Sequence, residues 1–155
     1  MWIVRSQALE NHKSVRQQMK KIYSLEIEHE DNPGTVELTQ KLTLDKSRPA
    51  MGLAGTYGLY GSSKWWENLY SGKIPKRIYE GTIEDIHFSG MNNESKSFTL
   101  RLNDGESYNY SCEVNRKRNM KHYQVGRKVK VIEFIENMKT GGDHEFVWSI
   151  EIENA

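Results

Sequence analysis

The spacing of apolar residues from residue 77 onward is the strongest constraint on the fold. In this part of the chain, apolar and polar residues alternate over five short segments, as they do in strands that bury one face. The pair Asp104-Gly105 lies between the second and third segments and is typical of a tight hairpin turn. The five segments cover residues 78–88, 98–102, 107–110, 129–134 and 146–152. We therefore predict five strands in this half of the chain.

These strands are expected to form a small barrel. Gly81 interrupts the first strand, where a glycine kink would let the sheet bend. A polar stretch over residues 115–122 then separates the third strand from the fourth. Five strands with such a kink and such a break suggest an OB-like or SH3-like barrel. The predicted fold class is α+β, mainly antiparallel β, with the five-stranded barrel in the C-terminal half.

Two elements are predicted before residue 45. Residues spaced by three and four positions indicate an N-terminal helix with Ser6 as its N-cap. From residue 23 to residue 44 the apolar spacing changes to two, on both sides of the turn-forming stretch from Glu30 to Gly34, so we predict a β-hairpin there. The helical stripe consists of Ala8, His12, Val15, Met19 and Ile22.

A glycine-rich segment and a short helix follow. Glycines recur at positions 52, 55, 58 and 61, and the residues between them are apolar or aromatic, unlike those of a flexible linker. We expect an ordered loop that packs its Leu and Tyr side chains. Ser62 or Ser63 then caps a helix carrying Trp65 and Trp66, and Gly72 ends it.

The chain of 155 residues is long enough for one domain with a substantial core. We expect residues 1–76, with their helix, hairpin and Gly/aromatic segment, to pack on the barrel formed by residues 77–155. No run approaches the about 18 apolar residues of a membrane span. The start of the chain becomes charged after four residues, unlike a secretory signal. These features predict a cytoplasmic protein that does not enter a membrane.

Motifs for common catalytic chemistry are missing from the sequence. Gly72-Lys73 is followed by Ile74, which does not match a phosphate-binding loop, and no GxSxG stretch occurs. The five histidines are dispersed, and Cys112 is the single cysteine, which excludes a Cys-rich zinc site. We predict no catalytic residues, no metal and no cofactor. An enzyme whose site is assembled from scattered polar residues is kept as a third alternative, and a nuclease using His122 with Arg116 and Lys121 is one example.

An aromatic cluster is the first candidate binding site. Trp66 and Tyr70 fall on one face of the predicted helix, whereas the adjacent Trp65 points about 100° away. Exposed Trp and Tyr dominate protein-interface hot spots, although both tryptophans could instead belong to the core. The predicted partner-binding residues are Tyr57, Tyr60, Trp65, Trp66 and Tyr70.

A basic window supplies the second candidate site. The net charge of the chain is only +1, but residues 111–135 hold seven basic and two acidic residues, between two acidic segments. This alternation suits charge pairing across a sheet. It also suits single-strand binding, in which basic side chains contact phosphates and aromatic rings stack on bases. The candidate nucleic-acid-binding residues around the 115–130 window are Tyr108, Tyr110, Arg116, Lys117, Arg118, Lys121 and Tyr123.

The sequence favours a non-catalytic protein-interaction module. A compact domain with aromatic and mixed-charge surfaces matches, by type, inhibitor or toxin-neutralising (immunity) proteins that dock on one partner protein. The alternative is an OB-like barrel that binds single-stranded nucleic acid.

Overall fold

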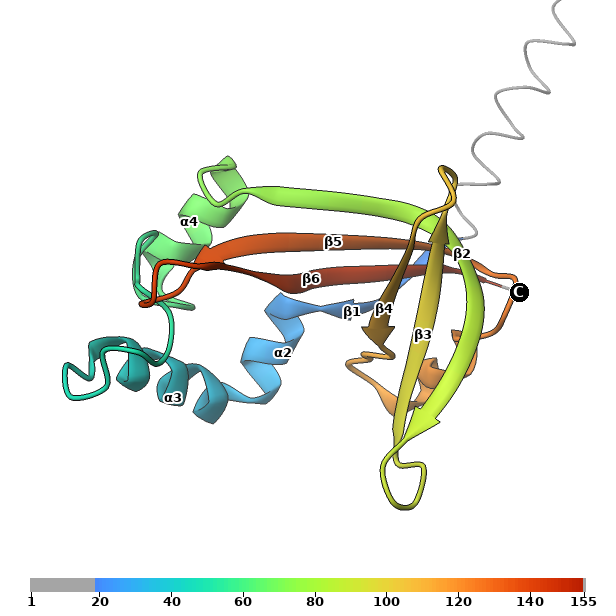
Figure 1. Ribbon diagram of the computed structural model, residues 1–155, viewed down its shortest axis with the longest axis horizontal. Coiled ribbons are helices and arrows are strands. Elements are labelled where there is room, and N and C mark those ends of the chain that lie inside the picture. Colours follow the sequence, from blue (N-terminus) through green and yellow to red (C-terminus); the bar gives the residue numbers. More distant parts are fainter. Residues whose placement is uncertain (1–18, 155) are drawn as a thin grey trace, which may run out of the picture. The chain divides into compact units, whose positions relative to one another are not determined.

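The computed structural model describes residues 19–154 and contains one six-stranded antiparallel sheet with a few helices (Figure 1). The strand order is β1-β6-β5-β2-β3-β4. The α+β fold class predicted from the sequence is therefore confirmed. The strands are β1 (Met19–Ser24), β2 (Lys76–Ser89), β3 (Ser95–Leu102), β4 (Ser107–Ser111), β5 (Lys128–Asn137) and β6 (Asp143–Glu153).

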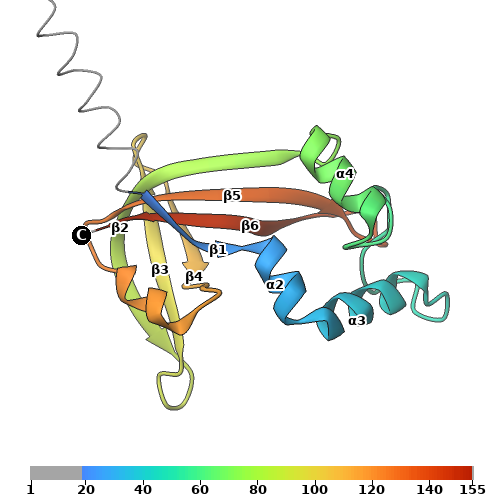
Figure 2. The same ribbon diagram turned by 180° about the vertical axis from the view of Figure 1, so that it is seen from behind.

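The five strands predicted after residue 77 correspond to β2–β6, and β5 and β6 run side by side in both views (Figures 1 and 2). The tight turn lies where Asp104-Gly105 predicts it, because the Gly105 amide donates to the Leu102 carbonyl and the Gly105 φ is +91°. The sheet is open, however, with β1 and β4 as its edge strands. The predicted barrel closure is therefore not seen in the sheet of residues 19–154.

Gly81 in β2 is required by a close approach between strands. A Cβ atom at this position would lie 2.1 Å from the Arg101 carbonyl oxygen of β3. The register of β2 against β3 shifts shortly afterwards, between Ile83 and Asp85. The interruption that the sequence predicts at Gly81 thus marks a place where only hydrogen fits between two backbones.

The hairpin predicted over residues 23–44 is wrong, because two helices occupy most of this stretch. They are α2 (Leu25–Asp31) and α3 (Pro33–Leu44). The Ser24 hydroxyl accepts from the Ile27 amide and caps α2, and Pro33 occupies the first turn of α3, where its missing N–H costs nothing. The residues interpreted as a turn are therefore a helix boundary.

The predicted N-terminal helix falls mostly on residues 1–18, which lie outside the described residues. Its last part, from Met19 to Ile22, is wrong because this stretch belongs to β1. The Trp-bearing helix is confirmed as α4 (Ser63–Ser71), with Ser62 as N-cap and Gly72 in the left-handed conformation at its end. A 3₁₀ helix, η1 (Lys117–His122), lies in the polar stretch.

The chain forms two compact units. Of the described residues, the β3–β4 unit contains Met19–Ile22, Glu80–Lys130 and Ile150–Asn154, and the helical unit contains Tyr23–Tyr79 and Val131–Ser149. Each unit draws on residues from both sides of position 76, and the boundary expected there stays a prediction. The core of the β3–β4 unit includes Ile83, Phe98, Leu100, Tyr123 and Ile152.

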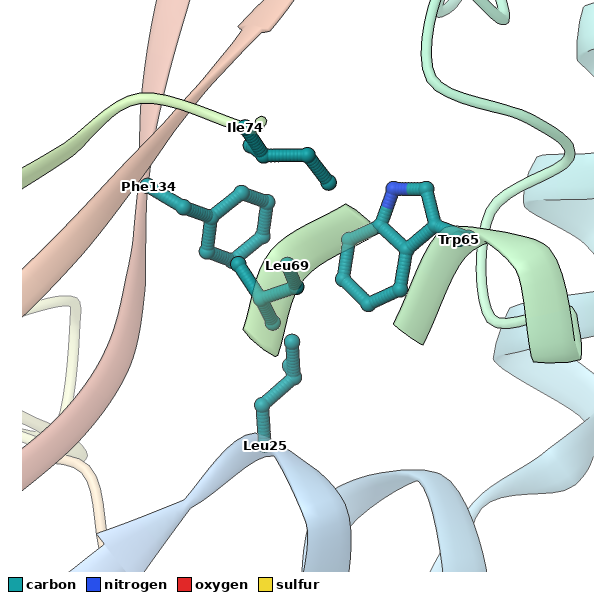
Figure 3. Packing of buried hydrophobic residues seen from close by; sticks show 5 residues of the cluster. All are labelled: Leu25, Trp65, Leu69, Ile74 and Phe134. Carbon is teal, nitrogen blue, oxygen red and sulfur yellow. The ribbon is translucent and has the colours of Figure 1, made fainter. Parts of the chain in front are cut away.

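The core of the helical unit is built around Trp65 and Phe134, whose rings meet edge to face with centroids 5.4 Å apart. Leu25, Leu69 and Ile74 complete this cluster, and in Figure 3 Leu69 lies between the two rings. All five side chains are 5% exposed or less. Because α2, α4 and β5 all contribute to it, this cluster fixes α2 against α4.

The glycine-rich segment packs against α3. A Cβ atom at Gly52 would lie 2.9 Å from Leu42, and one at Gly61 would lie 2.8 Å from Val36. The ammonium of Lys139 reinforces the end of this helix by donating to the carbonyl oxygens of Leu42, Asp45 and Arg48, at 2.5, 3.1 and 3.3 Å. The segment is thus ordered, as predicted. No helix among residues 19–154 has the length and apolar character to cross a membrane.

Candidate functional site

The five aromatic residues predicted to bind a partner all lie in the helical unit, but at different depths. Trp65 is fully buried and belongs to the core. Tyr57, Tyr60 and Trp66 are half-buried, and Tyr70 is 58% exposed. Tyr70 is therefore the most exposed member of this set, the half-buried Trp66 contacts it, and Trp65 supports both from the core.

Helix α4 sets this division between core and surface. The Ser62 hydroxyl accepts from the Trp65 amide and caps the start of the helix. Because successive residues of a helix are rotated by about 100°, Trp65 and the adjacent Trp66 point in different directions. Trp66 and Tyr70, one turn apart, stack with an interplanar angle of 23° and centroids 5.7 Å apart. The shared face predicted for these two residues is thus present as a direct ring contact.

Glu26 on α2 joins two aromatic residues. One of its carboxylate oxygens accepts from the Tyr70 hydroxyl at 3.2 Å and from the Trp148 indole Nε1 at 2.5 Å. Burial, the charge of Glu26 and this hydrogen bond raise the pKa of Tyr70. The Tyr70 and Trp148 rings also lie close together, with centroids 5.8 Å apart. A single carboxylate therefore fixes the orientation of aromatic side chains from α4 and β6.

His29, one turn after Glu26 on the same helix, lies among the rings. Its Nε2 is hydrogen-bonded to the Tyr60 hydroxyl at 2.9 Å, and its ring meets Trp66 edge to face at 5.1 Å. Burial lowers the pKa of His29, and the negative charge of Glu26 opposes this shift only partly. His29 is therefore neutral at pH 7 and adds no positive charge to this surface.

These side chains enclose an open recess of about 350 Å³ on the helical unit. Its lining, which we call the α2–α4 surface, consists of Glu26, His29, Glu30, Trp66 and Tyr70. Sequence reasoning missed Glu26, His29, Glu30 and the neighbouring Trp148. The dense acidic run of α2, Leu25–Asp31, is a visible signal, but the apolar spacing of this stretch predicts a strand and a turn instead.

The residues proposed for nucleic-acid binding do not form a stacking platform. Tyr123 is 2% exposed, and its hydroxyl donates to the Glu113 carbonyl, so it belongs to the core. Tyr110 is half-buried and stacks on Phe98, and Tyr108 is at the surface, where its hydroxyl donates to Glu106. The four basic residues Arg116, Lys117, Arg118 and Lys121 are exposed in and beside η1.

The residues considered for catalysis also lie in the β3–β4 unit. His122 is 8% exposed, its Nδ1 faces the Arg127 guanidinium at 3.4 Å, and burial with nearby Lys and Arg charges lowers its pKa. Burial raises the pKa of the Cys112 thiol to about 11, so it is a poor nucleophile. Within residues 19–154, no group of three or more His, Cys, Asp or Glu side chains is placed to hold a metal ion.

Comparison with protein-family models places this chain in a family. The search of curated proteins found no match. The family model described as "Immunity protein RhsI2" matches residues 19–151, which is most of the chain, and supports an immunity-type interaction module in preference to nucleic-acid binding. The chain therefore belongs to the RhsI2 family of immunity proteins, which confirms the predicted non-catalytic protein-interaction module of immunity type.

Proposed function

We propose that this chain neutralises a toxin by binding it through the α2–α4 surface. The observation that carries this proposal is the stacked pair of Trp66 and Tyr70, which is presented at the surface and tied to Glu26 by a hydrogen bond. Large aromatic side chains at a surface supply most of the binding energy in protein interfaces. The toxin would be a protein that acts in the cytoplasm of the cell that makes this chain.

The α2–α4 surface is suited to binding because its side chains are already fixed. Glu26 accepts hydrogen bonds from Tyr70 and Trp148, and Trp66 lies against both Trp65 and Tyr70. Trp65 is in turn held in the core. A surface whose side chains are ordered before binding loses less conformational entropy when a partner docks. This arrangement supports tight binding without chemistry at the site.

The test begins with the partner itself. The intact chain is used to capture proteins from the cells that produce it, and the captured protein is identified and made separately. We expect this protein to stop growth when it is expressed alone and to be harmless when the chain is co-expressed. A captured protein that never affects growth would contradict the toxin-neutralising function.

The role of the surface is then tested with matched variants. Trp66→Ala and Tyr70→Ala should each weaken toxin binding by at least about 30-fold, as removal of hot-spot residues does. Phe88→Ala is the control, because Phe88 is 56% exposed, close to the exposure of Tyr70, but lies in the β3–β4 unit. If the two α4 variants bind the toxin as the wild type does while remaining folded by circular dichroism, the proposed surface is wrong.

A further inference from the structure

We propose that the recess of the α2–α4 surface receives one arginine side chain of the partner protein. This inference rests on the proposed function and goes further, because it names the chemical group that the surface recognises. Three independent features support it: two carboxylates that form no ion pair with the described residues, two aromatic rings that line the recess, and a cation–ring contact next to the recess.

The first feature is the charge on α2. Glu26 and Glu30 are one turn apart and both line the recess. Like charges at this spacing destabilise a helix, and within residues 19–154 neither carboxylate forms an ion pair. His29 between them is neutral at pH 7, as its burial requires. The recess therefore carries two negative charges that a bound cation would offset.

The second feature is the pair of rings on α4. Trp66 and Tyr70 stack on each other and form the wall of the recess contributed by α4. The negative face of an aromatic ring attracts a cation placed over it, and tryptophan attracts it most strongly. Two carboxylates on α2 and two aromatic rings on α4 together form a site of the kind that binds a positively charged side chain.

The third feature is a cation that contacts a neighbouring aromatic ring, Trp148, next to the recess. The ammonium of Lys76 lies 4.8 Å from the centre of the Trp148 ring, whose indole N–H donates to Glu26. One ring bonded to Glu26, that of Trp148, therefore already has a cation over its face within the helical unit. The recess also combines the Glu26 carboxylate with aromatic rings, those of Trp66 and Tyr70, and no Lys or Arg among the described residues lines it.

Arginine fits this combination better than lysine. Its guanidinium is planar, so it can stack on a ring while its edge donates two parallel hydrogen bonds to a carboxylate. The guanidinium is also more weakly hydrated than an ammonium group, so its transfer out of water costs less free energy. A lysine could satisfy the charge but not the stacking and the paired hydrogen bonds at once.

The first test uses small probes on the full chain. Blocked arginine (Nα-acetyl-arginine amide) is titrated into ¹⁵N-labelled protein at pH 7.5, and the indole N–H signals of the tryptophans are followed by NMR. We expect saturable shifts for Trp66 and Trp148 with a Kd on the order of 10 mM, as for one isolated contact of this type. Blocked citrulline has nearly the same shape without the charge and should cause no saturable shift.

Two results with these probes would overturn the proposal. One is the absence of saturable shifts with arginine, and the other is equal binding of blocked arginine, blocked lysine and blocked citrulline. Glu30→Gln should weaken arginine binding about tenfold, since it removes one of the two charges. Glu67→Gln is the matched control, because Glu67 is an exposed residue of α4, pairs with Lys64 and does not line the recess.

The second test separates this inference from the proposed function. Binding of the identified toxin should weaken about tenfold or more in Glu30→Gln and remain unchanged in Glu67→Gln. If Trp66→Ala abolishes binding while Glu30→Gln does not affect it, the arginine proposal fails and the proposed surface stands. If neither substitution affects binding, both proposals fail.

Discussion

The indole Nε1 of Trp65 donates to the carboxylate of Glu136 across 3.4 Å, and both side chains are buried, with 0% and 1% of their surface exposed. Glu136 comes from β5 and Trp65 from α4, so this contact links two elements of the helical unit. Burial raises the pKa of Glu136 to about 7, although the hydrogen bond from Trp65 opposes the shift. A buried carboxyl group therefore contacts Trp65, the core residue against which Trp66 of the proposed binding surface packs.

Glu136 should make the chain less stable as the pH rises. The pKa of Glu136 is about 7 in the folded chain and 4.5 when the side chain is not buried. The folded chain therefore keeps this proton over a pH range in which the unfolded chain has lost it. The stabilisation is present below pH 4.5 and is lost between pH 4.5 and pH 7, by up to about 3 kcal/mol.

The variant Glu136→Gln tests this pH dependence, because a glutamine side chain does not titrate. The free energy of unfolding, measured in urea at several pH values, should fall less steeply between pH 5 and pH 8 in the variant than in the wild type. Comparing the two slopes removes the contribution of every other titrating group. Parallel curves for the two proteins would show that Glu136 does not hold a proton near neutral pH.

Lys139 should stabilise the end of α3. Its ammonium donates to three carbonyl oxygens there, and Lys139→Met keeps the aliphatic length but removes these bonds. Loss of hydrogen bonds to a charged donor should lower the free energy of unfolding by about 2 kcal/mol. Lys73→Met is the control, because Lys73 is exposed. Equal losses in the two variants would contradict a specific role for Lys139.

The strands after residue 77 and the helix α4 could be predicted because the sequence patterns that specify them are local. Alternating burial along each strand and the turn at Gly105 depend on neighbouring residues, and so do the caps of α4 at Ser62 and Gly72. The hairpin predicted over residues 23–44 is wrong because most apolar residues of this stretch are not buried, so their spacing does not report which face of an element packs on the core. Leu38 and Leu44 are 68% and 66% exposed, and no residue of α3 is buried.

The candidate site was only partly predictable, because its key contacts join distant parts of the chain. The stacking of Trp66 and Tyr70 follows from their spacing on one helix. Glu26 is 44 positions from Tyr70 and 122 positions from Trp148. The spacing of residues along the sequence does not indicate such a long-range contact. The contact forms because the core cluster brings α2 and α4 together.

Two glycines with positive φ should respond differently to alanine. Gly61 has a φ of +77°, and a Cβ there would lie 2.8 Å from Val36, whereas Gly72 has a φ of +87° and open space around it. Gly72→Ala should cost only the backbone term of about 1 kcal/mol. Gly61→Ala should cost more, because α3 must also shift. Thermal unfolding of both variants checks the order, and equal melting temperatures would show that α3 yields without cost.

Tyr70→Phe separates the ring of Tyr70 from its hydroxyl. The variant keeps the stacking on Trp66 but loses the hydrogen bond to Glu26, so the ring is less firmly oriented. Toxin binding should weaken about fivefold, in line with one lost hydrogen bond, and much less than in Tyr70→Ala. Calorimetric titration of the toxin with the three proteins gives the comparison. If Tyr70→Phe binds as weakly as Tyr70→Ala, the hydroxyl carries the contact with the toxin and the stacked ring does not.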